Sequence, residues 1–347
     1  MPRRPIWFVT RMPRCLIALG ANLGDRERSL QRAVELLGAE RQISLVACSR
    51  WHETAPVGGA PNQGPFLNGV LCLDTDLTAE QLRDALGRIE ARLGRIRARR
   101  WDARLIDLDL LLYGNLVIAT PTLVVPHPRM AFRRFVLEPA AEAAPEMVHP
   151  TIGWSIGQLL AHLNTALPYV ALMGPPGCGK TSLARSLAGR FGGRFIADPA
   201  MPWPPSGLAN PPSHVYERQI QFLDRRTNAL DARNWQQSDV LAVSDFYFDQ
   251  SLAYAQTELA ARDYEAFCRA WAAAGAHVIR PKLLVVLDAP PGDTAEQPAT
   301  ESAHAGRLRR ELLGVAARSG TGPVLYASGG DEQAQFDEIS AAIAAVQ

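Results

Sequence analysis

The sequence predicts two domains, an N-terminal α+β domain with a mostly antiparallel sheet and a C-terminal α/β domain with a parallel sheet. Three observations support this. The chain has 347 residues, enough for two average domains. The first half mixes short strand-like runs with segments of helical spacing, as α+β domains do. From about residue 165, apolar strand-like runs alternate with helices around a glycine-rich loop, which is typical of a parallel sheet covered on both faces.

In the first half, the predicted strands are short and the predicted helices are amphipathic. Strands are predicted over residues 15–19, 45–47, 71–73 and 106–113, and a helix over 26–37. A second helix is predicted over 79–93, where apolar residues recur on one face: Leu82, Leu86, Ile89 and Leu93. Thr78 and Gln81 have the spacing of a capping box at its start.

In the second half, strands are predicted over residues 169–173, 240–244 and 283–287, with a helix from about Thr181 to Phe191. A helix over 156–163 comes before the first of these strands, and only residues 164–168 separate the two. We therefore expect a tail over residues 1–13, a first domain over 14–165 and a second over 166–347.

Composition excludes several classes of protein. The formal charge is +1, with 36 basic and 35 acidic residues, which disfavours a nucleic-acid or membrane surface. No run of about 18 uncharged apolar residues is present, so no membrane span is expected. The five cysteines form no C-x-x-C pair; zinc sites and a disulfide framework are therefore disfavoured, and a cytoplasmic location is the simplest expectation. The oligomeric state is left open.

Asp107 and Asp109 lie in an otherwise apolar predicted strand. Residues two apart in a strand share a face, so these carboxylates point the same way. They repel each other unless cations sit between them, and Mg²⁺ commonly joins one or two carboxylates to phosphate oxygens. The alternative is a solvated strand face with two exposed aspartates.

Arginines crowd the segment before this strand: Arg95, Arg97, Arg99, Arg100 and Arg104. Arginine binds phosphate bidentately, and Trp101 among them offers a ring that stacks on a base. An arginine-rich loop beside two carboxylates therefore suits a polyphosphate with its metal ions. The alternatives are a solvated basic loop and a nucleic-acid-binding segment, which the neighbouring acids oppose.

Taken together, these segments resemble the 6-hydroxymethyl-7,8-dihydropterin pyrophosphokinases. The resemblance covers roughly residues 14–165 and rests on these motifs: 18–24 (ALGANLG), 54–58 (TAPVG), 66–68 (FLN), 94–97 (GRIR), 100–104 (RWDAR), 107–109 (DLD), 125–130 (VPHPRM) and 133–135 (RRF). It implies a ferredoxin-like fold and transfer of pyrophosphate from ATP to the pterin hydroxymethyl group, with release of AMP, in folate synthesis.

The resemblance also implies roles for individual residues. Asp107 and Asp109 would bind two Mg²⁺ ions that bridge the ATP phosphates, and Arg95 and Arg104 would hold the polyphosphate. The nucleotide side would be lined by Glu90, Arg97, Arg100, Trp101, His127 and Arg133. The pterin would be held by Thr54, Ala55, Pro56, Val57, Phe66, Asn68 and Phe135. A flat ring with donors and acceptors suits aromatic stacking and an amide.

Residues 174–181 (GPPGCGKT) match the phosphate-binding pattern G-x-x-x-x-G-K-[ST] between a predicted strand and a predicted helix. Its fixed positions are Gly174, Gly179, Lys180 and Thr181, and Gly177 also belongs to the loop. Backbone amides at the start of the helix bind phosphate. Lys180 is expected to reach the β- and γ-phosphates, and the Thr181 hydroxyl to bind Mg²⁺.

Residues 169–347 resemble the deoxynucleoside kinases. Gln219 and Arg226 are seven residues apart, as in the helix of that family that contacts the base, and Asp245 lies in a segment like its acidic strand end. Asp198 stands where the family has a glutamate base. Phe246 replaces a frequent arginine, and residues 292–302, the place of the family's arginine-rich lid, contain no arginine.

Because of these departures, we expect the second half to bind nucleotide and to phosphorylate deoxynucleosides slowly or not at all. The small-molecule partners expected are the pterin, ATP and, for an active kinase, a deoxynucleoside. One alternative makes the second half a nucleotide sensor or scaffold. Another makes the chain a nucleic-acid-stimulated ATPase, which the near-neutral charge opposes.

Overall fold

The computed structural model describes residues 12–57, 63–95, 104–200, 214–235, 239–288, 299–318, 320–327 and 331–347. The chain forms two compact units, one of residues 1–150 with 155–157, the other of 151–154 with 158–347. The expected boundary after residue 165 is later than this division. Helix α4 (Ile156–Thr165) explains the difference: its Leu159 and Leu163 are fully buried, and His162 Nε2 donates to the Pro281 carbonyl of the second unit at 3.1 Å.

The first unit is built on an antiparallel sheet, as predicted. Strands run in the order β2–β4–β1–β5, with β3 also paired to β4. Their bounds are β1 (Arg14–Ala21), β2 (Ile43–Cys48), β3 (His52–Thr54), β4 (Phe66–Thr75) and β5 (Asp107–Tyr113). A short hairpin, β6 (Ile118–Ala119) and β7 (Val124–Val125), follows β5. The ferredoxin-like connectivity stays an expectation.

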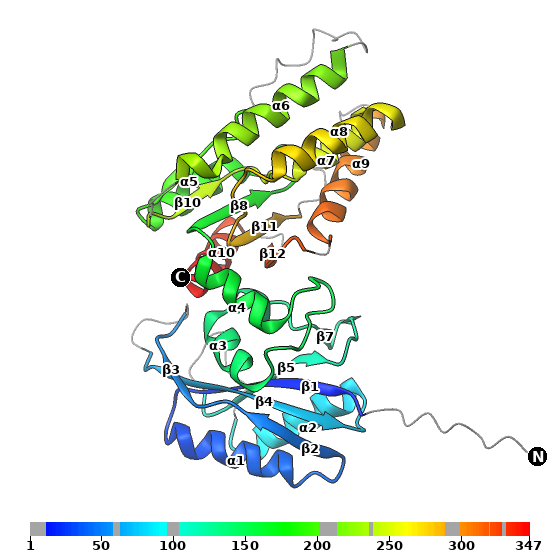
Figure 1. Cartoon of the computed structure of the whole chain (residues 1–347). Coiled ribbons are helices and arrows are strands. Elements are labelled where there is room, and N and C mark those ends of the chain that lie inside the picture. The colour runs from blue at the N-terminus through cyan, green and yellow to red at the C-terminus, as the bar shows by residue number, and fades with distance from the viewer. Residues whose placement is uncertain are drawn as a thin grey trace, which may run out of the picture. The chain divides into compact units, whose positions relative to one another are not determined.

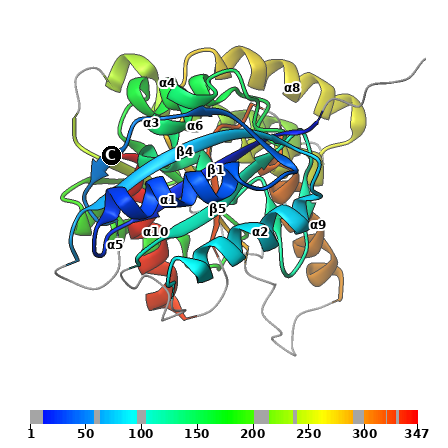
Figure 2. The same ribbon diagram turned by 90° about the horizontal axis from the view of Figure 1, so that it is seen from below.

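Helices cover both faces of this sheet (Figure 1 and Figure 2). Helices α1 (Arg26–Gly38) and α2 (Ala79–Arg92) pack on one face, and α3 (Arg134–Ala143) packs on the other. The predicted capping box is confirmed: Gln81 N donates to Thr78 Oγ1, and Thr78 N donates to Gln81 Oε1. The core lies between the sheet and α1 and α2, where β1 contributes Cys15, Ile17 and Leu19. The opposite face of β1 therefore does not contribute to this core.

The second unit is built on a parallel sheet in the order β12–β11–β8–β10–β9. Its strands are β8 (Tyr169–Met173), β9 (Arg194–Ile196), β10 (Ala242–Ser244), β11 (Leu283–Leu287) and β12 (Val324–Ala327). Helices α5 (Lys180–Arg190) and α10 (Glu332–Val346) contact one face. The other is covered by α6 (Val215–Leu230), α7 (Gln250–Glu258), α8 (Ala261–Gly275) and α9 (Ala299–Ala316). The predicted parallel sheet is confirmed.

Across the described ranges, none of the helices combines the length and the apolar character that crossing a bilayer requires.

Candidate functional site

The register of β1 with its two neighbours gathers polar side chains on the face opposite α1 and α2. Asp107 pairs with Gly20, and Asp109 pairs with Ala18. On the other side of β1, Asn68 also pairs with Gly20. A Cβ atom at Gly20 would lie 3.1 Å from Asn68 Oδ1. Small residues on β1 therefore keep open the space between the two aspartates and the amide.

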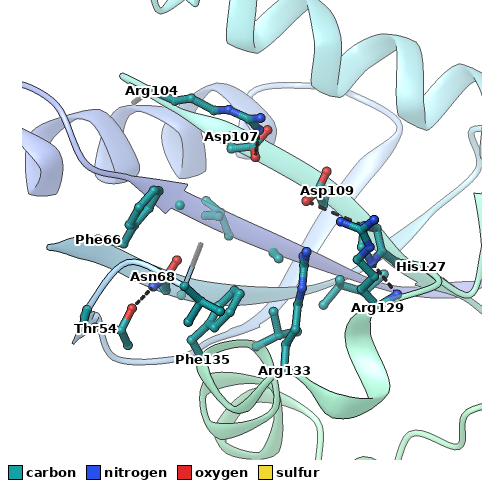
Figure 3. Close-up of a pocket in the computed structure, with 18 of the residues that line it drawn as sticks. Thr54, Phe66, Asn68, Arg104, Asp107, Asp109, His127, Arg129, Arg133 and Phe135 are labelled. Carbon is teal, nitrogen blue, oxygen red and sulfur yellow. Dashed lines mark hydrogen bonds and ion pairs between the residues drawn. The ribbon is translucent and has the colours of Figure 1, made fainter. Parts of the chain in front are cut away.

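This space is a cavity of about 450 Å³ (Figure 3). Most of the predicted site residues line it: Thr54, Ala55, Val57, Phe66, Asn68, Arg95, Arg104, Asp107, Asp109, His127, Arg133 and Phe135. In Figure 3 the aromatic rings and the amide lie at one end, and the carboxylates follow β5 along the other. The cavity thus joins an aromatic pocket to a strongly charged one.

At the charged end, Asp107 contacts two arginines. Its Oδ1 lies 2.8 Å from Arg95 Nη2, and its Oδ2 forms an ion pair with Arg104. Burial, and then the charge of Asp109, raise the pKa of Asp107, while both arginines oppose this shift. Asp107 and Asp109 offer oxygen donors on one strand face, a set that fits Mg²⁺. The two acids and two arginines together can hold a polyphosphate and its cations.

Glu90, at the end of α2, lies behind this cluster and does not line the cavity. Its Oε1 accepts the backbone N–H of Leu108 at 2.7 Å and also bonds Arg95. Burial raises the pKa of Glu90, and the Leu108 N–H and Arg95 oppose the shift. Glu90 thus supports Arg95 and β5, and its place on the nucleotide side stays a prediction.

His127 is a neutral ring beside Asp109. Its Nδ1 accepts the backbone N–H of Arg129 at 3.2 Å, which places the ring proton on Nε2. That nitrogen lies 4.0 Å from Asp109 Oδ2. Burial, and then Arg133 and Arg129, lower the pKa of His127 to about 3. His127 can therefore donate one hydrogen bond to a ligand near neutral pH.

The aromatic end combines two rings with a fixed amide. Asn68 Nδ2 donates to Thr54 Oγ1 at 2.8 Å, which leaves Oδ1 on the Gly20 side. Phe66 comes from β4 and Phe135 from the start of α3, and the Arg133 guanidinium lies 5.5 Å from the centre of the Phe135 ring. Such a pocket suits a flat heterocycle that needs both stacking and in-plane hydrogen bonds.

Not all of the predicted residues are among those that line the cavity. Arg97, Arg100 and Trp101 lie outside the described residues, and Pro56 does not line the cavity. Conversely, sequence reasoning did not single out Arg129 and Gln63, which do line it. Arg129 lies inside the motif 125–130, so the signal was present. Gln63 precedes β4 with no pattern that marks it.

In the second unit, the glycine-rich loop joins β8 to α5 as predicted. Gly177 and Gly179 both have φ of 79°, a conformation that favours glycine. A Cβ atom at Gly174 would lie 2.6 Å from the Leu287 carbonyl oxygen at the end of β11. Lys180 Nζ donates to the Pro175 carbonyl at 2.7 Å. The loop therefore has the backbone conformation and the lysine of a phosphate cradle.

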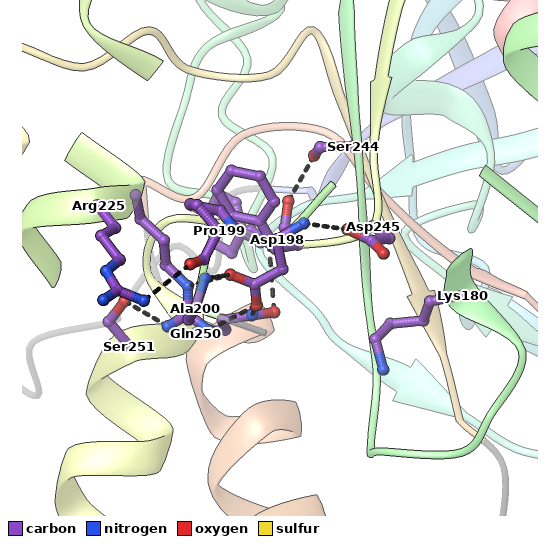
Figure 4. Close-up of polar contacts among 12 residues, drawn as sticks. Lys180, Asp198, Pro199, Ala200, Arg225, Ser244, Asp245, Gln250 and Ser251 are labelled. Carbon is purple, nitrogen blue, oxygen red and sulfur yellow. Dashed lines mark hydrogen bonds and ion pairs between the residues drawn. The ribbon is translucent and has the colours of Figure 1, made fainter. Parts of the chain in front are cut away.

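A chain of hydrogen bonds leads from this loop to Asp198. Thr181 Oγ1 donates to Asp245 Oδ2 at 2.6 Å. Asp245 Oδ1 in turn accepts the backbone N–H of Asp198 at 2.6 Å (Figure 4). Asp245 follows β10 directly, and Asp198 lies just beyond β9. The start of α5 and the ends of two neighbouring strands thus bring together the predicted metal-binding hydroxyl, the Asp245 carboxylate and the Asp198 backbone.

Donors surround the Asp198 carboxylate. Arg226 donates to it through Nε at 3.0 Å and through Nη2 at 2.7 Å. Gln250 Nε2 donates to it at 3.1 Å, and the backbone N–H of Ala200 donates at 3.0 Å. Gln219 also lies in this region of α6, where its Nε2 donates to Glu258 at 2.9 Å. Its buried Oε1 has no partner among the residues that the structure describes. Asp198, the base expected from the family resemblance, is thus held in an ion pair with Arg226.

Of the expected lid, residues 292–298 lie outside the described ranges and residues 299–302 begin α9. Among the arginines that follow, Arg309 pairs with Asp288 at the end of β11 through Nε at 2.6 Å and Nη2 at 2.8 Å. Arg307 Nη2 donates to the Gln256 carbonyl at 2.9 Å. Both arginines are therefore engaged by neighbouring helices and strand ends.

Comparison with known proteins separates the two halves. A family model described as 7,8-dihydro-6-hydroxymethylpterin-pyrophosphokinase matches residues 16–145, and a model of the ATPase family associated with various cellular activities matches residues 170–200. Among solved structures, NadR protein in complex with NAD and AMP-PNP is 18% identical with a TM-score of 0.40, covering 52% of this chain and 50% of that chain. Deoxyadenosine kinase from M. mycoides, with dCMP and dCDP bound, is 11% identical with a TM-score of 0.40, covering 49% and 96%.

Curated relatives cover just under half of the chain. A 2-amino-4-hydroxy-6-hydroxymethyldihydropteridine pyrophosphokinase of Pseudomonas aeruginosa is 39% identical over 164 residues, which are 47% of this chain and 98% of that protein. The enzyme of the same name from Synechocystis is 36% identical over 163 residues, 47% of this chain and 83% of that protein. Through its N-terminal half, the chain belongs to the 7,8-dihydro-6-hydroxymethylpterin-pyrophosphokinase family.

Proposed function

We propose that the first unit transfers the pyrophosphoryl group of ATP to the hydroxymethyl group of 6-hydroxymethyl-7,8-dihydropterin and releases AMP, a step of folate synthesis. The observation that carries this proposal is the single cavity that joins the aromatic pocket to the paired carboxylates and arginines. Pyrophosphoryl transfer needs both, because the acceptor is a flat heterocycle and the donor is a polyphosphate. Family membership supports the same reaction.

The pterin binds at the aromatic end. Phe66 and Phe135 stack against its two faces, and Asn68 Oδ1 accepts from a ring N–H. Thr54 holds the Asn68 amide in the orientation that presents this oxygen. Ala55 and Val57 complete the apolar wall, and the family resemblance assigns Pro56, which lies between them, to the same side. Shape and hydrogen bonding together select a pterin over a simple aromatic alcohol.

ATP binds at the charged end. Asp107 and Asp109 would hold Mg²⁺, two ions in the proposed arrangement, which neutralises charge on the phosphate oxygens when bound. Arg95 and Arg104 bind the polyphosphate through their guanidinium groups, which also contact Asp107 in the structure. His127 and Arg133 lie toward the nucleotide, His127 as a neutral donor. Arg97, Arg100 and Trp101 are assigned to the same side by the family resemblance.

The chemistry is an in-line displacement. The pterin hydroxymethyl oxygen forms a bond to the β-phosphorus of ATP, and the bond from that phosphorus to the oxygen shared with the α-phosphate breaks. AMP leaves with that oxygen, and the hydroxyl proton passes to solvent. The chain contributes mainly position, by aligning the two substrates in one cavity, and charge, through Arg95 and Arg104.

The test is direct. The full chain is incubated with Mg²⁺-ATP, with and without the hydroxymethyl-dihydropterin, and AMP is separated from ADP. AMP that requires the pterin and is lost on chelation of Mg²⁺ is the expected result. Asp107→Asn and Asp109→Asn should each reduce the rate by roughly 10²-fold or more, since charge stabilisation by a metal is worth several kcal/mol. No AMP from the unaltered chain would contradict the proposal.

For the second unit we propose nucleoside triphosphate binding at the glycine-rich loop, with Lys180 on the phosphates and Thr181 on Mg²⁺. The chain of contacts from Thr181 through Asp245 supports a metal-nucleotide site. The engagement of Asp198 by Arg226 and Gln250 argues against rapid transfer to a deoxynucleoside, because a substrate hydroxyl must displace one of these donors to reach the carboxylate. A nucleotide-sensing role fits these contacts better than an efficient kinase.

The second assay supplies each deoxynucleoside with Mg²⁺-ATP and measures ADP. Little or no ADP above the rate without nucleoside is expected. Rapid ADP formation with any one of them would identify an acceptor and refute the sensing role. An Asp107→Asn background removes AMP formation from the measurement.

A further inference from the structure

Asn22 is a buried polar residue at the edge of the proposed active site. It directly follows Ala21, the last residue of β1, and is 7% exposed. It lies two residues beyond Gly20, which forms part of the cavity floor. Asn22 itself does not line the cavity, so any effect on the reaction acts through its neighbours.

The main neighbour is the backbone of Arg104. The Asn22 backbone N–H donates to the Arg104 carbonyl at 3.0 Å. The Arg104 backbone N–H donates to Asn22 Oδ1 at 2.6 Å. Because an N–H can only donate, the atom that faces Arg104 must be the amide oxygen. One residue thus holds both backbone polar groups of Arg104.

This hold matters because Arg104 precedes β5 and is not itself in the strand. Its guanidinium nevertheless contacts Asp107, three residues later. A side chain reaches a fixed point reproducibly only when its own backbone is fixed. Along the described part of the chain, the backbone N–H and carbonyl of Arg104 both bond to Asn22.

The nitrogen of the same amide contacts a second residue, Gln63, which precedes β4. Asn22 Nδ2 donates to Gln63 Oε1 at 3.4 Å, and Gln63 lines the cavity. The amide oxygen and nitrogen therefore contact two residues that line the cavity and lie 41 positions apart in sequence, Arg104 and Gln63. The oxygen makes the shorter bond, so the stronger link is to Arg104.

We propose that Asn22 is a positioning residue for pyrophosphoryl transfer, which holds the Arg104 backbone so that its guanidinium stays at Asp107 and the polyphosphate. This inference rests on the proposed function of the first unit. It assigns a role to the turn after β1, which contributes no side chain to the cavity.

The proposal predicts a particular kinetic pattern. Removing the amide lets Arg104 shift, and a displacement of about 1 Å at a reacting centre costs up to roughly 10²-fold in rate. We expect Asn22→Ala to reduce the single-turnover rate of AMP formation roughly 10- to 100-fold. The KM values for ATP and pterin should change by less than about threefold, because Arg95, the two aspartates and the aromatic pocket still bind the substrates in the ground state.

Two further variants separate positioning from a general structural role. Asn22→Asp keeps an oxygen for the Arg104 N–H and should retain a rate within about fivefold of the unaltered chain. Asn115→Ala, at an exposed turn of the same unit, is the matched control and should leave the rate unchanged. If Asn22→Ala does not fold, Asn22→Ser takes its place, since its shorter side chain cannot span the same distance.

The decisive comparison uses Arg104→Ala. If Asn22 acts through Arg104, then Asn22→Ala adds little further loss in an Arg104→Ala chain. Losses that multiply would overturn the proposal, as would an Asn22→Ala rate equal to the Asn115→Ala control or an Asn22→Asp rate as low as that of Asn22→Ala. Absence of AMP from the unaltered chain would instead overturn the proposed function and the role of Asn22 with it.

Discussion

Glu90 and Leu108 are joined by a hydrogen bond of 2.7 Å, in which the buried carboxylate accepts a backbone N–H. Leu108 lies between Asp107 and Asp109, so this bond ties the end of α2 to β5 at the two acidic residues. The same Glu90 oxygen also bonds Arg95, which in turn contacts Asp107. One carboxylate therefore supports the strand and the arginine together.

The first prediction concerns this support. Glu90→Ala leaves the Leu108 N–H without its acceptor, so the free energy of unfolding of the first unit should fall by about 1–3 kcal/mol. Glu90→Gln keeps an acceptor oxygen and should lose less. Urea unfolding followed by circular dichroism measures both, with the exposed Glu146→Ala as control. Equal losses in the Ala and Gln variants would contradict this account of Glu90.

The second prediction concerns the aromatic end of the cavity. Phe135→Ala removes one stacking surface, so the KM for the pterin should rise roughly tenfold. The KM for ATP should change little, because the carboxylates and arginines that bind it are retained. Steady-state AMP formation at varied pterin and varied ATP measures the two constants. A matching rise in both would show that Phe135 supports the whole cavity and does not select the pterin.

The third prediction concerns the number of nucleotide sites. Isothermal titration of the full chain with a non-hydrolysable Mg²⁺-ATP analogue should detect two sites, one in each unit. Lys180→Ala should weaken one of them by roughly 10- to 100-fold, since it removes a charge-assisted contact to phosphate. AMP formation should persist in that variant. Loss of AMP formation in Lys180→Ala would mean that the first unit depends on nucleotide bound to the second.

The fourth prediction concerns pH. Burial lowers the pKa of His149 to about 4, whereas an unfolded histidine titrates near about 6.5. The unfolded chain therefore takes up the proton first, so the stability due to neutral His149 is complete above about pH 6.5 and is lost as the pH falls toward 4. Lowering the pH from 7 to 5 should therefore reduce the free energy of unfolding of the first unit by about 2 kcal/mol.

Urea unfolding at the two pH values tests this sign. His149→Gln stays neutral throughout and should flatten the pH dependence of the first unit, whereas the exposed His304→Gln in the second unit should leave that dependence as it is. A His149→Gln chain as sensitive to acid as the unaltered one would assign the effect to other groups.

Much of the candidate site was predictable because its residues lie in compact motifs. The two-residue spacing of Asp107 and Asp109 predicted a shared face, and the register of β5 with β1 shows that face turned to the cavity. Glu90 was harder to place. It lies on the helical face that also buries Ile89 and Leu86, and spacing does not tell whether a carboxylate there meets a ligand or a backbone N–H.

In the second unit, too, a local motif was predictable and a contact between distant residues was not. The glycine-rich pattern predicted a strand, a loop and a helix, since a phosphate cradle needs particular backbone conformations that few sequences allow. The pairing of Asp198 with Arg226 was not predictable, because the two residues are 28 apart along the chain and meet only through packing of α6 beside the end of β9.

Local periodicity and short runs of particular residues were enough to predict the two-unit organisation, the antiparallel and parallel sheets and the positions of the acidic strand and the glycine-rich loop. Only the packing of the folded chain shows which of these polar groups are hydrogen-bonded to neighbouring residues. Glu90 supports β5, Asp198 is held by Arg226, and Asn22 holds Arg104, because hydrogen bonds between distant segments depend on how strands and helices pack, and no local pattern records that.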